Sequence, residues 1–178
     1  MKHAYVFPGQ GAQFSGMGKS LYDSSEAMKE LFEKANEVLG FRITDIMFSG
    51  SDEELKQTNI TQPAIFIHSV AAFKTIDSAK PDMVAGHSLG EYTSLICSNS
   101  LTLKEGAKIL KERGKSMQEA VPVNIGAMAA ILGAELDLVN EVINKNKSSE
   151  GVAAISNDNC PGQIVVSGNK EKIIKIVY

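Results

Sequence analysis

The sequence predicts an α/β protein with a parallel sheet covered on both faces by helices, followed by a smaller second subdomain. Short apolar segments alternate with segments of helical periodicity in the first part of the chain, as they do in parallel sheets. After about Pro122 the order becomes strand, helix, strand, strand and helix. We place a large domain at 1–123 and a small subdomain at 124–178. With 178 residues, 43% of them hydrophobic, the chain can form both cores.

The first expected element is a strand over residues 4–7 (AYVF), closed by the loop PGQG at 8–11. A helix should follow, because six apolar residues recur at helical spacing: Met28, Leu31, Phe32, Ala35, Val38 and Leu39. Asp23, with Glu26 three residues later, resembles a capping box for this helix. Gly40 stands where the helix should end.

Two further helices flank a second strand. Residues 62–76 predict a helix that opens at Gln62-Pro63, because a proline in the first turn removes only an N–H that has no partner there. Residues 83–85 (MVA) predict a strand that runs directly into the segment GHSLG. Residues 92–98 predict the helix that leaves this segment.

Another helix should run from a capping box at Thr102 and Glu105 to about residue 117. Its spacing gives these inward positions: Leu103, Ala107, Leu110, Gly114 and Met117. Arg113 lies at the edge of that face. A guanidinium that faces inward needs a carboxylate or phosphate partner, whereas one that reaches outward pairs with a surface acid. Spacing alone leaves both alternatives open.

The sequence of the small subdomain predicts a strand at 127–132, a helix at 136–143, strands at 152–155 and 164–166, and a helix that begins at Lys170. This order supplies five of the elements of a ferredoxin-like βαββαβ unit and lacks the last strand. The chain stops inside an apolar run, IIKIVY. We therefore expect an incomplete protein.

Composition excludes several classes of function. The net charge of −3 provides no basic stripe for nucleic acid or an anionic membrane. Cys97 and Cys160 give neither a disulfide framework nor metal-ligand spacing, as in a reduced compartment. The apolar segment near the N-terminus is too short for the core of a signal sequence, and no apolar run is long enough to cross a membrane. We expect a soluble cytoplasmic protein without a metal.

The segment GHSLG at residues 86–90 carries the chemistry. It matches G-x-S-x-G, in which a serine on a sharp strand-to-helix turn exposes its hydroxyl as a nucleophile. Gly86 and Gly90 let the strand and helix approach closely around Ser88, and the N–H of Leu89 points to where an oxyanion would form. The alternative is a tight turn with a capping serine.

A serine nucleophile needs a base, and none of the three histidines (His3, His68 and His87) follows Ser88 in the chain. Neighbouring side chains diverge in so tight a turn, so His87 is a poor base, and His68 suits a packed or surface histidine better. Gln10 lies in the loop after the first strand, at the sheet edge where ligands bind, and this loop could present a backbone N–H.

Five stretches together carry a family resemblance: FPGQGAQ at 7–13, TQPA at 61–64, GHSLGEY at 86–92, RG with MQ within 113–118, and NCPGQ with SG within 159–168. In this order they resemble the malonyl-CoA:acyl carrier protein transacylase family over the whole chain. The resemblance implies a hydrolase-like α/β large domain with an inserted ferredoxin-like subdomain. It also implies fatty-acid biosynthesis, with malonyl-CoA as a substrate, acyl carrier protein as a partner and no cofactor.

The resemblance also implies roles for individual residues. Ser88 would attack the malonyl thioester and carry the acyl group as an ester before transfer to the phosphopantetheine thiol. The backbone N–H groups of Gln10 and Leu89 would form the oxyanion hole. Arg113 would bind the malonyl carboxylate bidentately. Gln62 and His87 would also bind substrate.

One departure from the family affects activity. The family's catalytic histidine lies beyond the small subdomain, and this chain ends before reaching it. Loss of a catalytic base lowers turnover by on the order of 10^6, so these residues alone should be nearly inactive. Two alternatives are a serine esterase or thioesterase, which would not need the cation of Arg113, and a non-catalytic fragment that binds acyl carrier protein or a partner chain.

Overall fold

The computed structural model describes residues 2–76, 80–121, 125–147 and 151–178. These residues form two compact units, Met1–Glu119 and Ala120–Tyr178. The boundary expected after residue 123 falls at 122–124, outside the described residues. None of the described helices is long and apolar enough to span a membrane.

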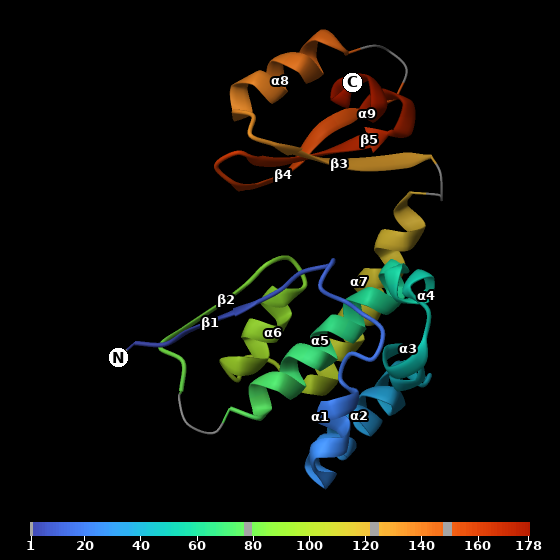
Figure 1. Ribbon diagram of the computed structural model, residues 1–178, viewed down its shortest axis with the longest axis vertical. Helices are drawn as coiled ribbons and strands as arrows, with labels where there is room; N and C mark the ends of the chain where they lie inside the picture. Colours follow the sequence, from blue (N-terminus) through green and yellow to red (C-terminus); the bar gives the residue numbers. More distant parts are fainter. Residues whose placement is uncertain (1, 77–79, 122–124, 148–150) are drawn as a thin grey trace. The chain divides into compact units, whose positions relative to one another are not determined.

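Unit 1 packs helices against one face of a parallel pair of strands (Figure 1). Its elements in order are β1 (Ala4–Phe7), α1 (Lys19–Ser24), α2 (Glu26–Leu39), α3 (Ile43–Ser49), α4 (Asp52–Lys56), α5 (Thr58–Lys74), β2 (Met83–Gly86), α6 (Gly90–Cys97) and α7 (Leu103–Ala120). β1 and β2 pair in parallel, so that Phe7 lies opposite Gly86. The loops that follow the two strands therefore leave the same edge of the sheet.

The core of unit 1 is built around α5. Its residues Ala64, Ile65, Phe66 and Ile67 are consecutive and buried, as expected of a helix that is covered on all sides. α7 approaches α5 closely, because a Cβ on Gly106 would lie 2.5 Å from Cζ of Phe66. A polar side chain on this part of α5 is therefore positioned by the protein that surrounds it.

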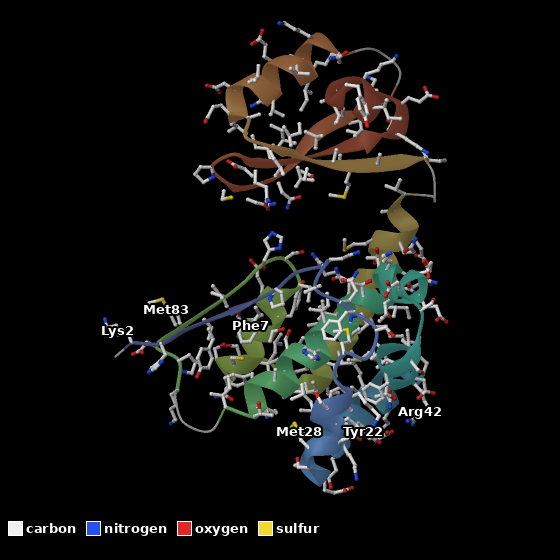
Figure 2. The ribbon with its side chains drawn as sticks, viewed as in Figure 1. Lys2, Phe7, Tyr22, Met28, Arg42 and Met83 are labelled. Atoms are coloured by element: carbon white, nitrogen blue, oxygen red, sulfur yellow. The ribbon has the colours of Figure 1, made fainter. Side chains whose placement is uncertain are left out.

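The strand pair has two different faces. On one face, Phe7 packs edge-on against Phe73 of α5, with 6.4 Å between ring centroids. On the other face, Val6 is 75% exposed and Met83 is 59% exposed. Figure 2 shows Phe7 and Met83 on opposite sides of the strands. Within the described residues, helices cover one face of this sheet, where the sequence predicted helices on both.

The start of α2 differs from the prediction. Its N-cap is Ser25, whose hydroxyl accepts a hydrogen bond from the Met28 N–H (3.2 Å). Asp23 instead pairs with Lys19 on α1. The helix ends at Gly40, as predicted, and Gly40 has the left-handed φ of 77° that favours glycine.

α5 begins four residues before the predicted start. The Gln57 carbonyl accepts hydrogen bonds from the N–H groups of Ile60 and Thr61 (both 2.8 Å) and from the Thr61 hydroxyl (3.0 Å). These bonds form the first turn before Pro63, which lies inside the helix. Gln62 is consequently buried within α5 and does not lie at an exposed helix start.

The short helices α1, α3 and α4 were not predicted, because so few residues show no clear periodicity. Tertiary contacts hold two of them. The Tyr22 hydroxyl of α1 donates to Glu33 on α2 (3.0 Å), and Arg42, which precedes α3, pairs with the same carboxylate (3.0 Å). Tyr22 and Arg42 are labelled in Figure 2. Partners from another helix thus fix elements that local sequence leaves ambiguous.

α7 opens with the predicted capping box: the Thr102 N–H donates to Glu105 (2.8 Å), and the Glu105 N–H donates to the Thr102 hydroxyl (3.3 Å). Its buried residues are Gly106, Ala107, Leu110 and Gly114. Met117 was predicted to face inward but is 44% exposed. The close packing of α7 against α5 ends near Gly114, where an added Cβ would lie 2.9 Å from Cα of Asn59 on α5.

Unit 2 contains the predicted order of strand, helix, strand, strand and helix. These elements are β3 (Gly126–Leu132), α8 (Leu136–Lys145), β4 (Ala153–Cys160), β5 (Gln163–Asn169) and α9 (Lys170–Val177). The strands form an antiparallel sheet in the order β3-β5-β4. Residues of α8, β5 and α9 share one buried cluster: Val139, Ile143, Ile164, Val166 and Ile173.

Candidate active site around Ser88

The turn between β2 and α6 holds Ser88 in a strained conformation. Its φ is 53°, and among the described non-glycine residues only Ser88 and Asn99 have a positive φ. Such a conformation costs about 1–2 kcal/mol for an L-residue and persists only where surrounding structure enforces it. The observed turn therefore matches the predicted nucleophile elbow, with an exposed serine.

Two glycines make this turn possible. A Cβ on Gly86 would overlap the carbonyl of Gly90, and a Cβ on Gly90 would overlap the carbonyl oxygen of Phe7. The end of β1, the end of β2 and the start of α6 thus pack backbone against backbone. The roles predicted for both glycines around Ser88 match this packing.

Leu89 is the N-cap residue of α6 and directly follows Ser88. Its side chain is buried, which anchors the turn in the core. The helical hydrogen bonds start with the Gly90 N–H, which donates to the His87 carbonyl (2.9 Å). The Leu89 N–H thus lies at the N-terminal end of the helix, where N–H groups carry partial positive charge.

The loop after β1 lies beside this turn. The His87 N–H donates to the Phe7 carbonyl (3.0 Å), which joins the two segments at the edge where both strands end. Gln10 extends from this loop toward α5, where its amide NH2 donates to the Thr58 hydroxyl (3.4 Å). Gln10 therefore reaches the same site as Ser88, although it lies 78 residues earlier in the chain.

Arg113 also belongs to the site. Its Nη2 donates to Oγ of Ser88 (3.0 Å), and its Nη1 donates to Oε1 of Gln62. The guanidinium carbon lies 6.0 Å from the centroid of the Tyr92 ring. Of the two orientations that spacing left open, the structure has Arg113 directed to Ser88 and not to a surface acid.

Gln62 connects the groups that surround Ser88. Its side chain is 1% exposed, its Oε1 accepts from Arg113, and its Nε2 donates to Oε1 of Gln10 (3.2 Å). The chain of contacts runs from Gln10 through Gln62 and Arg113 to Ser88. The sequence placed Gln62 among the substrate-binding residues but gave no sign of this bridge.

The three histidines occupy different surroundings. His3 precedes β1, at the end of the strand pair opposite Ser88, and its N–H donates to Asp82 (2.7 Å). Burial lowers the pKa of His68, and its Nδ1 has no hydrogen-bond partner within the described residues. The exposed His87 packs against Gly9, where an added Cβ would lie 2.6 Å from its Nδ1.

The two cysteines do not extend the site. Cys97 lies on α6 with its side chain buried, and burial raises the pKa of its thiol to about 11. Its thiol therefore stays protonated and unreactive at neutral pH. Cys160 is exposed and belongs to unit 2. The described part of the chain contains no group of three His, Cys, Asp or Glu residues arranged to hold a metal ion.

The sequence is similar to that of known transacylases. It is 41% identical over 176 residues to the malonyl CoA-acyl carrier protein transacylase of Staphylococcus aureus (strain MRSA252). This match covers 99% of the present chain and 57% of the relative. The transacylase of the same name from Bacillus subtilis (strain 168) is 42% identical over 174 residues, covering 97% of this chain and 55% of the relative. The chain thus spans a little over half the length of these relatives.

Solved structures of transacylases with the same name are similar to the structure of this chain. The malonyl CoA-acyl carrier protein transacylase from Clostridium perfringens superposes with a TM-score of 0.89 at 40% identity, over 99% of this chain and 56% of that one. The transacylase of the same name from Coxiella burnetii superposes with a TM-score of 0.91 at 36% identity, and the match covers 99% of this chain and 57% of that one. The acyl transferase domain family matches residues 4–178. The chain therefore belongs to the acyl transferase domain family.

Proposed function

We propose that this chain contains the nucleophile and the acyl-binding arginine of a malonyl-CoA:acyl carrier protein transacylase that serves fatty-acid biosynthesis. The observation that carries this proposal is the contact between a strained serine and a half-buried guanidinium, Ser88 and Arg113. A serine at such a turn suits acyl transfer. A cation beside it suits an acyl group that bears a carboxylate.

The reaction would proceed in two displacements. Oγ of Ser88 attacks the thioester carbonyl of malonyl-CoA, the new O–C bond forms, the C–S bond breaks and the CoA thiol leaves. The phosphopantetheine thiol of acyl carrier protein then attacks the ester, which restores the serine hydroxyl. In the first step a base must take the Ser88 proton and pass it to the departing CoA sulfur. In the second step it must take the proton of the phosphopantetheine thiol and return a proton to Oγ of Ser88 as the ester C–O bond breaks.

We place the base outside the three histidines of this chain. His3 lies at the wrong end of the strand pair, Nδ1 of His68 is buried, and His87 packs against Gly9. Turnover by these 178 residues alone should be lower than in the whole enzyme by on the order of 10^6.

Two backbone N–H groups would stabilise the oxyanion. Leu89 offers the N–H at the start of α6, and Gln10 offers one from the loop that the Phe7–His87 bond holds beside the turn. Removal of one such donor costs about 2.7–4 kcal/mol in other enzymes.

Arg113 would bind the free carboxylate of the malonyl group through two parallel N–H donors. The exposed His87 would contact substrate at the rim of the site. Gln62 is buried, so its contribution to substrate binding would pass through Arg113, which it contacts.

We also propose that unit 1 has a hydrolase-like fold and that unit 2 has a ferredoxin-like fold. The parallel pair that ends in the elbow supports a hydrolase-like arrangement in unit 1. The antiparallel order β3-β5-β4, whose core is shared with two helices, supports a ferredoxin-like arrangement in unit 2. The partner would be acyl carrier protein, and a similar structure (TM-score 0.89, 35% identity) is a malonyl-transacylase in complex with a type II PKS acyl-carrier protein. No cofactor is needed for the two displacements.

Calorimetry on variants that cannot be acylated tests the substrate. Ser88→Ala should bind malonyl-CoA at least about tenfold more tightly than acetyl-CoA, because hydrogen bonds to a charged group contribute about 1.5–3 kcal/mol. Adding Arg113→Ala should remove that preference. Adding Lys115→Ala should preserve it, since Lys115 lies on the same helix with an exposed side chain that pairs with Glu119 (4.0 Å). An unchanged preference without Arg113 would remove the assigned role of this residue.

A further inference from the structure

The loop at residues 8–13, which follows β1, contains the Gln10 N–H that we assign to the oxyanion. A Cβ on Gly9 would lie 2.6 Å from Nδ1 of His87, so the loop begins in close contact with the elbow. Beyond that point Gly11 has a φ of 114° and no neighbour within 4 Å of an added Cβ. No backbone–backbone hydrogen bond joins residues 8–13 to any part of the chain that the structure describes. Backbone bonds therefore do not fix Gln10.

The side chain of Gln10 attaches this loop to α5. Its Oε1 accepts a hydrogen bond from Nε2 of Gln62 (3.2 Å), and its Nε2 donates to the Thr58 hydroxyl (3.4 Å). Thr58 and Gln62 are four residues apart on α5, so they lie on the same face of that helix. Both ends of the Gln10 amide are thus bonded to one helix.

Arg113 sets the direction of these hydrogen bonds. A guanidinium only donates, so the amide oxygen of Gln62 faces Arg113 and its NH2 faces away. Gln62 is 1% exposed, and a buried NH2 without an acceptor is costly, which favours its bond to Oε1 of Gln10. The Gln10 amide is consequently held in one orientation, with its NH2 toward Thr58.

We propose that Thr58 and Gln62 are positioning residues for the oxyanion: by holding the Gln10 side chain, they keep its backbone N–H in place beside the elbow. This inference rests on the proposed function of Ser88 and Gln10. The Gln10 N–H donates to no acceptor among the residues that the structure describes, so it is available to an oxyanion. A donor of this kind is effective because it is already in place when charge develops. Without the two side-chain bonds, the loop would have to become ordered during the reaction, which lowers the rate.

Acylation of Ser88 by two different donors tests this role. The chain is incubated with malonyl-CoA or acetyl-CoA and the small base imidazole, and the acyl group on the Ser88 peptide is followed by mass spectrometry. Both thioesters form an oxyanion, so a misplaced donor should slow both reactions by the same factor. Gln10→Met keeps the backbone N–H but loses both bonds, so both rates should fall about tenfold, less than the roughly 10^2–10^3 that removal of a whole donor costs. Thr58→Val loses one neutral hydrogen bond and should lower both rates about threefold.

Two matched variants separate positioning from a general loss of stability. Thr58→Ser keeps the hydroxyl and should restore both parent rates. Thr75→Val makes the same substitution at the other end of α5, where the Thr75 hydroxyl donates to the Ala72 carbonyl (2.7 Å), and should leave both rates unchanged. Amide spectra show that each variant is folded. The ps–ns mobility of the amide at position 10, measured by 15N relaxation, should increase in Gln10→Met and Thr58→Val and return to the parent value in Thr58→Ser.

The outcomes distinguish this inference from the proposed function. Equal slowing with both donors in Gln10→Met and Thr58→Val, reversed in Thr58→Ser, supports the positioning role. Parent rates in Gln10→Met and Thr58→Val overturn the positioning role and leave Ser88 as the nucleophile. Slowing with malonyl-CoA alone also overturns it, because these residues would then act only on carboxylate binding. No acylation of Ser88 in the parent chain by either donor overturns the proposed function, and this inference with it.

Discussion

At the scale of single residues, the backbone of Ser88 is held in a strained conformation. A φ of 53° costs a serine about 1–2 kcal/mol. The surroundings enforce this conformation, because Gly86 and Gly90 lie too close to neighbouring backbone to accommodate a side chain. Strain at a residue with an exposed hydroxyl is one of the observations that support the proposal of Ser88 as the nucleophile.

The roles of Gln62 and Arg113 show how much of the site could be predicted at this scale. Spacing on one helix could not decide the direction of Arg113, because its partners Gln62 and Ser88 lie 51 and 25 residues away in the chain. Gln62 is linked to Gln10 across 52 residues. No local pattern encodes such contacts; they arise only when α5, α7 and the two loops pack together. The resemblance to a family did supply Arg113, Gln10 and Ser88 as site residues.

The two cysteines should differ sharply in reactivity. At pH 8, iodoacetamide should alkylate the exposed Cys160 and leave Cys97 unmodified, because burial raises the pKa of Cys97 to about 11 and keeps its thiol protonated. The stability that this protonated thiol contributes should be present below its ordinary pKa of 9.0 and be lost as the pH rises toward 11. Peptide mapping by mass spectrometry measures both alkylation rates. Equal alkylation of the two thiols at pH 8 would contradict the burial of Cys97.

At the scale of elements, local signals predicted helix ends where a cap is encoded by nearby residues. The Thr102–Glu105 capping box and the glycine at position 40 both lie where expected. The start of α5 was predicted four residues late, because Pro63 looked like a first-turn residue. In the structure the Gln57 carbonyl and the Thr61 hydroxyl form that turn earlier. The earlier start matters, since it places Gln62 in the interior beside Arg113.

The elbow should not tolerate a side chain at its second glycine. Gly90→Ala would force a Cβ against the Phe7 carbonyl oxygen, so the free energy of unfolding should fall by about 2–3 kcal/mol and Ser88 should be displaced. Urea denaturation measures the first effect, and acylation of Ser88 by malonyl-CoA measures the second.

Gly133→Ala in unit 2 is the matched control for this substitution. It has no neighbour within 4 Å of an added Cβ, but it has a φ of 78°. It should therefore lose only about 1–2 kcal/mol through backbone strain and leave Ser88 reactivity intact. A Gly90→Ala variant as stable and reactive as the parent would show that the elbow is not packed as described.

At the scale of the whole molecule, unit 1 contains all the residues proposed as the nucleophile, the oxyanion donors and the carboxylate-binding arginine. The order of the strands and of the other helices in both units followed from the periodicity of the sequence, whereas the short helices α1, α3 and α4 and the exposed face of the strand pair could not be predicted from it. Its residues Val6 and Met83 are apolar, so alternation gave no sign of which face lies open. The one component that neither unit supplies in the proposed mechanism is the base.

The most direct test of Ser88 as the nucleophile is the mass of the chain after incubation with malonyl-CoA and imidazole, a small base that can stand in for a histidine side chain. We expect one malonyl group on the peptide that contains Ser88, formed faster as imidazole is added, and absent in Ser88→Ala. Cys160→Ser should give the same result as the parent chain, because the exposed thiol is the competing acceptor. A malonyl group found only on Cys160, or none on Ser88 at any imidazole concentration, would contradict the assignment of Ser88 as the nucleophile.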